Sequence, residues 1–548
     1  MNKMMNRMQI LFLSFLIAAL GSCAQESKSA DKSLTDYVGL WEGRETHPGS
    51  LNMDITIEVQ GAEAIFKLAN RNEILSQAFQ LEESFRLSLE EGLSFRGRMN
   101  ADLSVIEGFV GLKKDLYPTK LYKEGNSYKG KCNLSALQYL RQDHFLLQMK
   151  AVTEEEYSAY PMLGTFWASD FQQEGEAISF QDFKTGLGFK GKLKADEILL
   201  DIHIGSHVLT TVSYQTTQPP TKASPAQLPS DDRWKMSPTQ LNLKKMEAAI
   251  KDQTLEGTEG VIISQNGEIV YEQYFGGFAA DIPHDIRSAG KSIGSAIIGL
   301  GVDRGIIEDV DQLLYPYIPP KYQYTSDSLK SQITLKGLLT MRSGIQVYED
   351  TYQESDDWLK TALEAPLGHA PQTRTMYKSA DPFLSGVYLN ERIDMPMEFF
   401  IVDNLLAPLG ITNYIMNTDD RGIPYFGGGI HLTPRDILAF GQLYLDKGRW
   451  KGKQVISEQW VNESVEKHTN LENVADKNGY GYFWWHHAYR VNDREISSVE
   501  ARGAGGQYIF ILAELNAVVV ITSGNYRNGK TRQPEQVLED YILEELAK

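Results

Sequence analysis

Apolar and polar residues alternate in short runs between residues 37 and 214. The runs 53–57 and 207–212 are examples, and turn residues separate such runs throughout the region. Successive side chains of a strand point to opposite faces, so this alternation is typical of antiparallel strands with one buried face. The segment 95–102 is echoed by 189–196, which indicates two related halves. We therefore predict an all-β sandwich or barrel domain over 37–214.

The pattern changes from residue 238 onward, where helical periodicity lies between short apolar strands. An Asn-Gly turn at 265–267 between two apolar runs is a strong hairpin signal. A second strand pair is expected at 508–512 and 518–522, followed by a final helix over 535–546. Strands near both ends, with helices between them, predict one antiparallel sheet that both termini close. We expect this α/β (more narrowly α+β) domain to span 238–548.

Residues 215–237 connect the two predicted domains. Proline cannot continue a helix or a central strand, and this stretch contains several among small polar residues, so we predict a Pro-rich linker. The prolines of this stretch are Pro219, Pro220, Pro225 and Pro229. No motif in 37–214 indicates chemistry, and a spacer is our default prediction for that β-rich domain. Shaping substrate access and binding a glycan or lipid are the alternatives.

The N-terminus has the pattern of an export signal. Basic residues precede an apolar run over 10–20 that is too short to span a bilayer as a helix. The run closes with Leu-Gly-Ser before Cys23, and this end resembles a bacterial lipoprotein signal. The resemblance implies a signal peptide over 1–22, lipid attachment to Cys23 and a tether over 23–36. An ordinary cleaved signal peptide is the alternative. We expect an exported cell-membrane lipoprotein that faces the periplasm or the cell surface.

Composition and charge narrow the expected partners. The chain of 548 residues has a formal net charge of −18 at pH 7, and no basic stripe stands out along it. A nucleic-acid-binding surface needs such a stripe, so nucleic acid is not an expected partner. The chain has two cysteines. Once Cys23 carries a lipid, Cys132 has no partner for an intramolecular disulfide.

The most informative chemical signal is a Ser-x-x-Lys step at 288–291, which precedes an apolar run with helical spacing. Residues three apart share one face of a helix, so the lysine amine can reach the serine hydroxyl. A serine in the first helical turn also lies beside backbone N–H groups that can stabilise an anion. The same pattern occurs at 29–32, in a polar tail, and at 464–467, on an expected solvated helix. We predict Ser288 as the nucleophile and Lys291 as its base.

Two further elements could complete such a site. Tyr377 beside a serine and a lysine could relay protons between base, nucleophile and leaving group, although alone it could be an ordinary half-buried ring. The segment 501–507 is rich in small residues, which let a backbone approach a ligand closely. An N–H from this edge could join the N–H of Ser288 in an oxyanion hole. A tight turn before a strand is the alternative.

Together these elements resemble the serine β-lactamase and penicillin-binding-protein superfamily. Within it they are most similar to the class C β-lactamase-related serine hydrolases and esterases and to the 6-aminohexanoate-dimer hydrolases. The resemblance implies a β-lactamase-like domain in which a helical subdomain accompanies the sheet. It covers about residues 229–548, and further stretches match the family in order and spacing: 333–344, 407–410, 427–436 and 480–485.

The resemblance also implies roles for individual residues. Ser288 is the nucleophile, Lys291 is the base, and Tyr377 is the proton-relay tyrosine of the family's Tyr-x-Asn motif. Ser379 stands in place of the asparagine, as in the aminohexanoate-type branch. Lys291 must be uncharged to accept a proton, and burial disfavours an ammonium.

Gly503, Ala504 and Gly505 stand where the penicillin-recognising members have Lys-Thr-Gly or His-x-Gly. The resemblance implies that the backbone N–H of Ala504 joins that of Ser288 as the second oxyanion donor. It also implies that Ser379, Gly503 and Gly505 line the substrate. The family's cation is missing at this position, which disfavours binding of a β-lactam carboxylate.

These roles predict a serine hydrolase that cleaves an ester or amide bond of a small-molecule or peptide-like acyl substrate through an acyl-enzyme. One alternative is a β-lactamase or D,D-peptidase acting on cell-wall peptides, and another is a non-catalytic binding protein on the same fold. No cofactor and no metal are expected. His486 and His487 are adjacent and point away from each other, and His431 precedes an expected helix start.

Overall fold

The structure is a computed structural model that describes most of the chain from Leu34 onward. The predicted signal peptide, Cys23 and most of the predicted tether lie outside the described residues. None of the helices in the described part has both the length and the apolar character needed to cross a bilayer. The described residues are 34–70, 73–89, 92–134, 140–141, 144–151, 157–160, 168–182, 187–216, 231–353, 355–474, 479–491, 493–526 and 528–548.

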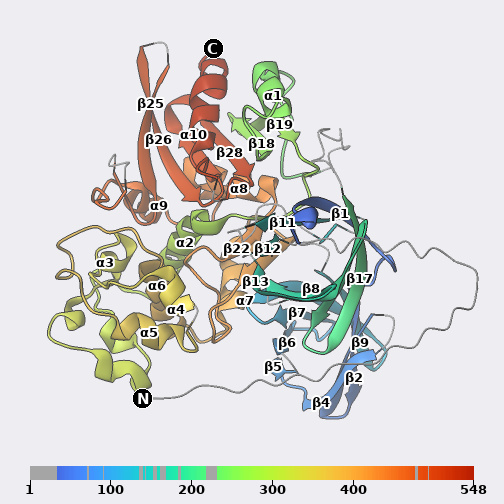
Figure 1. The fold of residues 1–548 in the computed structure, drawn as a ribbon. Coiled ribbons are helices and arrows are strands. Elements are labelled where there is room, and N and C mark those ends of the chain that lie inside the picture. Colours follow the sequence, from blue (N-terminus) through green and yellow to red (C-terminus); the bar gives the residue numbers. More distant parts are fainter. Residues whose placement is uncertain are drawn as a thin grey trace, which may run out of the picture.

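The N-terminal region is all-β, and its blue and green strands lie together on one side of the molecule (Figure 1). The first of its two antiparallel sheets has the order β10-β11-β1-β17-β16-β15-β14-β13, and β12 pairs with β11. A short 3₁₀ turn, η1 (Leu34–Tyr37), leads into β1. The strands are β1 Gly39–Glu45, β10 Leu140–Arg141, β11 His144–Ala151, β12 Tyr157–Tyr160, β13 Ala168–Glu174, β14 Ala177–Asp182, β15 Gly188–Lys194, β16 Glu197–Ile204 and β17 His207–Thr216.

The second sheet continues from the N-terminal region into the domain that follows. Its order is β4-β3-β2-β9-β8-β21-β22-β20, with β7, β6 and β5 following one another outward from β8. Its N-terminal strands are β2 Asn52–Gln60, β3 Glu63–Ala69, β4 Glu73–Gln80, β5 Ser84–Ser88, β6 Leu93–Met99, β7 Val105–Leu112, β8 Asp115–Glu124 and β9 Ser127–Asn133. The strands from the later domain are β20 His284–Asp285, β21 Tyr414–Asn417 and β22 Ile430–Leu432.

The internal echo of the sequence falls on corresponding strands of the two sheets. Gly97 lies in β6 and Gly191 in β15, and each strand leads through a short turn into its next neighbour, β7 or β16. A Cβ at Gly97 would lie 2.5 Å from the Phe85 ring, and a Cβ at Gly191 would clash with the Leu199 carbonyl. The repeated glycine therefore permits close approach of a neighbouring strand in both halves.

The domain that follows contains a third antiparallel sheet with the order β19-β18-β28-β27-β26-β25. Strands from both ends of this domain meet in it, which confirms the predicted closure, because β18 pairs with β28. The predicted hairpin joins β18 to β19, with φ of 54° at Asn266 and 78° at Gly267. The bounds are β18 Thr258–Gln265, β19 Glu268–Tyr274, β25 Trp485–Val491, β26 Arg494–Gly503, β27 Gln507–Leu512 and β28 Ala517–Ser523.

Both faces of this sheet are covered by helices, which explains why β28 is buried along its whole length. Val518 and Val520 belong to the core that includes α8, whereas Val519 and Ile521 belong to the core formed with α1 and the C-terminal helices. Alternate residues of one strand thus serve two separate cores. Figure 1 shows α2 between this sheet and a group formed by α3, α4, α5 and α6, the helical subdomain.

The helices are α1 Lys244–Lys251, α2 Gly290–Asp303, α3 Leu335–Leu339, α4 Glu349–Gln353, α5 Trp358–Glu364, α6 Ala380–Asn390, α7 Met397–Ile401, α8 Pro434–Leu445, α9 Glu458–Val465, α10 Gln533–Val537 and α11 Leu543–Leu546. A π-helical turn, η10 (Leu538–Ile542), joins α10 to α11, so the predicted final helix is irregular at its centre. Shorter turns and strands are η4 Arg287–Ala289, η5 Tyr315–Tyr317, η6 Pro320–Thr325, η7 Lys330–Gln332, η8 Val402–Leu406, η9 Ala513–Leu515, β23 Arg449–Trp450 and β24 Lys453–Gln454.

The β7–β8 side of the N-terminal region packs closely against the later domain. β8 pairs with β21, where Leu116 lies opposite Met416. Arg96 and Glu398 form an ion pair of 2.8 Å across the junction, with side chains only 6% and 5% exposed. Phe109 belongs to the core of the later domain. The strand pairing, the ion pair and the packing of Phe109 make this junction continuous. Loss of either partner of the ion pair would leave a buried charge unpaired, at a cost of about 3–5 kcal/mol.

Candidate active site

Ser288 lies in the single 3₁₀ turn η4, which leads directly into α2. The sequence prediction placed this residue within the first turn of the helix itself. The difference arises at Arg287, whose φ of 51° turns the chain sharply between β20 and α2. Asp285 holds this turn, because its carboxylate accepts the Arg287 amide at 3.1 Å and pairs with the guanidinium at 2.9 Å. Ser288 is therefore presented just ahead of a buried helix.

Lys291, in the first turn of α2, is only 1% exposed. Its Nζ lies 2.7 Å from Ser288 Oγ and donates to the Gly427 carbonyl at 2.7 Å. No carboxylate among the described residues forms an ion pair with Lys291. Lys291 is thus held between the serine hydroxyl and a backbone carbonyl in the buried start of α2.

A glycine segment before β22 packs against the serine turn. Gly428 has a φ of +131°, and a Cβ there would lie 2.5 Å from the Arg287 carbonyl oxygen and 3.0 Å from the Ser288 amide nitrogen. Only glycine combines this backbone conformation with so close an approach. The same segment supplies the carbonyl of Gly427 that orients Lys291. The sequence motifs pointed to this stretch, but they did not indicate its contact with Lys291.

Tyr377 brings an aromatic ring beside the pair. Lys291 Nζ lies 5.3 Å from the centroid of this ring, and the ring of Trp485 packs against it at 5.2 Å. The backbone of Tyr377 is held by one side chain: its amide donates to Asn473 Oδ1 at 2.7 Å, and Asn473 Nδ2 donates to its carbonyl at 3.0 Å. Sequence reasoning missed Asn473, because nothing in its neighbourhood distinguishes it from other loop residues.

The small-residue loop at the end of β26 lies against the serine turn. A Cβ at Gly503 would clash with the Ile286 carbonyl and lie 3.2 Å from the Ala289 amide nitrogen. Gly505 has a φ of +80°, and a Cβ there would clash with the Tyr526 ring. Both glycines thus serve close backbone packing. The residue between them, Ala504, is exposed and lines the pocket that contains Ser288.

A pocket of about 110 Å³ opens beside Ser288. Its lining includes Ala504 but not Ser379, Gly503 or Gly505, which were predicted to line the substrate. Ser379 lies 1% exposed at the start of α6, and its hydroxyl has no hydrogen-bond partner in the described part of the chain. The lining residues are Lys114, Arg287, Ser288, Glu349, Gln353, Trp358, Asn417, Thr418, Tyr425, Gly427, Gly428, Gly429 and Ala504.

Lys114 is the unexpected member of this lining, because it belongs to the N-terminal region. It follows β7 in the turn that leads into β8. Sequence reasoning had no signal for it, since a lysine in a hairpin turn is ordinarily a solvated residue.

The remaining predicted elements lie away from this pocket. His486 and His487 are adjacent on β25, and His431 lies buried in β22. The described residues contain no cluster of three or more histidine, cysteine or acidic side chains suited to a metal. Cys132 is fully buried, and burial raises the pKa of its thiol to about 12, so the thiolate is strongly disfavoured there.

The profile of the β-lactamase family matches residues 244–541, more than half of the chain. Among characterised proteins, the chain is similar to the 6-aminohexanoate-dimer hydrolase of Paenarthrobacter ureafaciens. The two are 23% identical over 293 residues, which cover 48% of this chain and 71% of the relative.

Two solved structures are also similar to this chain. One from Bacillus anthracis, provisionally named a 6-aminohexanoate-dimer hydrolase, is 19% identical with a TM-score of 0.48 and covers 60% of this chain and 89% of its own. A penicillin-binding protein from Bacillus halodurans is 17% identical with a TM-score of 0.41 and covers 53% of this chain and 97% of its own.

Proposed function

Because the chain belongs to the β-lactamase family, we propose that it is a serine hydrolase that cleaves an ester or amide bond through an acyl-enzyme. The observation that carries this proposal is the 2.7 Å separation of Ser288 Oγ and Lys291 Nζ beside a pocket. A hydroxyl is a weak nucleophile until a neighbouring base takes its proton. This pair supplies both groups at hydrogen-bonding distance.

Acylation follows from the contacts of Lys291. In the reacting state of this proposal the amine is uncharged: one N–H donates to the Gly427 carbonyl, and the lone pair accepts from Ser288 Oγ, which lies 2.7 Å away. The proton of Ser288 passes to Lys291 as the oxygen attacks the substrate carbonyl carbon, and a tetrahedral oxyanion forms. Ser288 and Ala504 both line the pocket, and in this proposal their two backbone N–H groups stabilise that oxyanion.

Collapse of the oxyanion breaks the bond to the leaving alcohol or amine, which must receive a proton. In this proposal Tyr377 passes the proton from the lysine to the leaving group, and the support is the position of its ring beside Lys291. Water then attacks the acyl-enzyme and gives its proton to Lys291. Lys291 returns this proton to Ser288 Oγ as the acyl–oxygen bond breaks and the carboxylic acid departs. The same three side chains thus act in acylation and in hydrolysis of the acyl-enzyme.

A labelling experiment tests this proposal. A fluorophosphonate probe should modify Ser288, as mapped by peptide mass spectrometry, and leave the second described Ser-x-x-Lys serine, Ser464, unmodified. Absence of labelling at Ser288 would favour the non-catalytic binding protein. A panel of nitrophenyl esters, anilides and a chromogenic cephalosporin then defines the reaction. Turnover of the cephalosporin alone would favour a β-lactamase or D,D-peptidase.

We also propose that the protein acts at a membrane surface through a lipid on Cys23. The support is the sequence pattern of the N-terminus, which resembles a lipoprotein signal. Intact mass spectrometry of the protein from a native membrane extract is the test. A Cys23→Ser variant that remained in the membrane fraction would contradict the proposal.

A further inference from the structure

One turn of the N-terminal region reaches the pocket of Ser288. β7 ends at Leu112 and β8 begins at Asp115, and the turn between them carries Lys113 and Lys114. Lys113 is exposed, whereas Lys114 is half-buried and lines the pocket. Two neighbouring lysines therefore have different surroundings, and of the two Lys114 lines the pocket of Ser288.

The position of Lys114 is set by backbone contacts with the later domain. Its carbonyl accepts the amide of Thr418 at 2.6 Å and the hydroxyl of the same residue at 3.1 Å. The next residue, Asp115, pairs in register with Asn417 and accepts a hydrogen bond from its side chain. Thr418 and Asn417 themselves line the pocket. The turn is thus part of the pocket wall and not a loop that merely lies near it.

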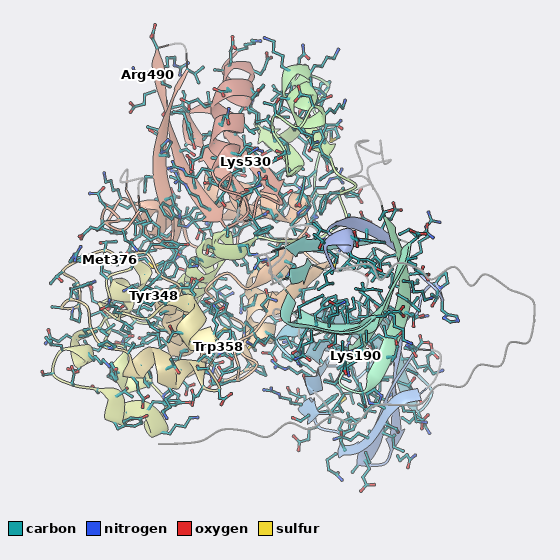
Figure 2. The ribbon with its side chains drawn as sticks, in the orientation of Figure 1. Lys190, Tyr348, Trp358, Met376, Arg490 and Lys530 are labelled. Carbon is teal, nitrogen blue, oxygen red and sulfur yellow. The ribbon has the colours of Figure 1, made fainter. Side chains whose placement is uncertain are left out.

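The ammonium of Lys114 is also held. Its Nζ lies 4.4 Å from the centroid of the Trp358 ring, at the start of α5. Figure 2 shows Trp358 on the side of the helical subdomain that faces the N-terminal strands. Burial lowers the pKa of Lys114, and the nearby carboxylates of Asp420 and Asp115 oppose this effect. A partly desolvated cation forms stronger hydrogen bonds to an anion than a solvated one.

The other charges of the pocket do not duplicate this role. The guanidinium of Arg287 pairs with Asp285 at 2.9 Å and stacks over the Tyr526 ring at 5.0 Å. Glu349 is the carboxylate in the lining, and it is exposed, so water screens its charge. Lys114 is therefore the cation of this lining best placed to meet an anionic group of a bound substrate.

We propose that Lys114 binds a carboxylate of the substrate beside the scissile bond, so that the N-terminal region supplies a specificity-determining residue to the active site. This inference rests on the proposed hydrolase function and deepens it by naming the substrate class: an ester or amide that carries a carboxylate. The N-terminal region then contributes a side chain to the substrate-binding site and is also a neighbouring domain.

The test compares pairs of esters that differ by one carboxylate. 4-Nitrophenyl valerate and mono-4-nitrophenyl glutarate differ by a terminal carboxylate on the acyl side, and phenyl butyrate and 4-carboxyphenyl butyrate differ on the leaving-group side. Lys114→Gln should lower kcat/KM for the anionic member of one pair by about 10- to 100-fold, mainly through KM. The neutral member should change by less than about 2-fold.

Two matched variants separate charge from folding. Lys114→Arg should retain most of the preference for the anionic ester, because it keeps the positive charge. Lys113→Gln, one residue away, should leave both esters unchanged. Loss of the same factor on anionic and neutral esters in Lys114→Gln would overturn the inference, as would an unchanged preference.

A second measurement does not depend on turnover. Glutarate should slow fluorophosphonate labelling of Ser288 in the wild-type protein and should protect Lys114→Gln about 10-fold less well. Labelling that glutarate does not slow in either protein contradicts the role of Lys114 while leaving the hydrolase function intact. Failure of the probe to label Ser288 at all contradicts the hydrolase function itself.

Discussion

The described part of the chain contains the Ser-x-x-Lys pattern twice, and the two copies differ in local structure. Ser288 lines a pocket, and the amine of Lys291 lies 2.7 Å from its hydroxyl. Ser464 lies buried on α9 and donates to the carbonyl of Val461 at 3.0 Å. α9 ends at Val465, so Lys467 falls beyond the helix and is exposed.

The difference shows that spacing alone does not make a catalytic pair. A helix must continue through both residues for the i and i+3 side chains to share a face. In the first copy the 3₁₀ turn η4 carries Ser288 and runs directly into α2, so helical turns extend through both residues. Gly427 and Gly428 pack against this turn and the lysine. In the second copy the helix ends and the serine hydroxyl bonds to its own helix backbone. The distinguishing contacts come from distant parts of the chain.

The most severe test of this comparison is removal of each serine hydroxyl. Ser288→Ala should lower kcat for a nitrophenyl ester by about 10⁴-fold or more, because no other group in the site can form the acyl-enzyme. Ser464→Ala should retain kcat and lose about 1 kcal/mol of stability with its buried hydrogen bond. Steady-state kinetics and thermal unfolding measure both, and a fully active Ser288→Ala would refute the proposed nucleophile.

Removal of each lysine amine should have the next largest effect. Lys291→Met keeps the length of the side chain but removes the base, and kcat should fall by about 10³-fold. Lys467→Met, on the exposed lysine of the second copy, should be unchanged within about 2-fold. Pre-steady-state measurement of the nitrophenolate burst identifies the slowed step as acylation. Equal losses in the two variants would mean that Lys291 is not the base.

Two glycines, one beside each Ser-x-x-Lys copy, allow a further test of the comparison. Gly428→Ala should lower kcat by about 10²-fold, since its Cβ would displace the turn of Ser288. Gly479 is a matched control, with a φ of +139° and a predicted Cβ contact to the Lys467 side chain at 2.8 Å. Gly479→Ala should lose stability through its backbone conformation but keep kcat per folded molecule. Circular dichroism and active-site titration correct each rate for folding.

The smallest expected effect concerns Asn473, which lies after the second copy yet contacts Tyr377. Asn473→Ala should lower kcat by about 10-fold or less, because Trp485 still packs on the tyrosine ring. Asn470→Ala, on an exposed neighbour, is the control. The ratio of amide to ester turnover is the informative readout, since amides depend more on protonation of the leaving group. An unchanged ratio would argue against Tyr377 as the relay.

Local patterning predicted most of the fold of the later domain. The Asn-Gly hairpin and the apolar runs of β27 and β28 have the pairing that their sequence indicates. Such features depend on a few neighbouring residues and on the period of a strand or helix. The position of Ser288 ahead of α2 was less predictable, because it depends on the positive φ of Arg287 and on its contacts with Asp285.

The sequence by itself determined the all-β and α+β regions and proposed the serine, the lysine and the tyrosine as a group, because these follow from periodicity and from recognisable motifs. Only the tertiary structure decided which carbonyl orients Lys291, which asparagine holds Tyr377 and which lysine borders the pocket. Gly427 is 136 residues from Lys291 along the chain, and Lys114 comes from another region altogether. Contacts at such separations depend on how whole sheets and helices pack, and no short stretch of sequence encodes them.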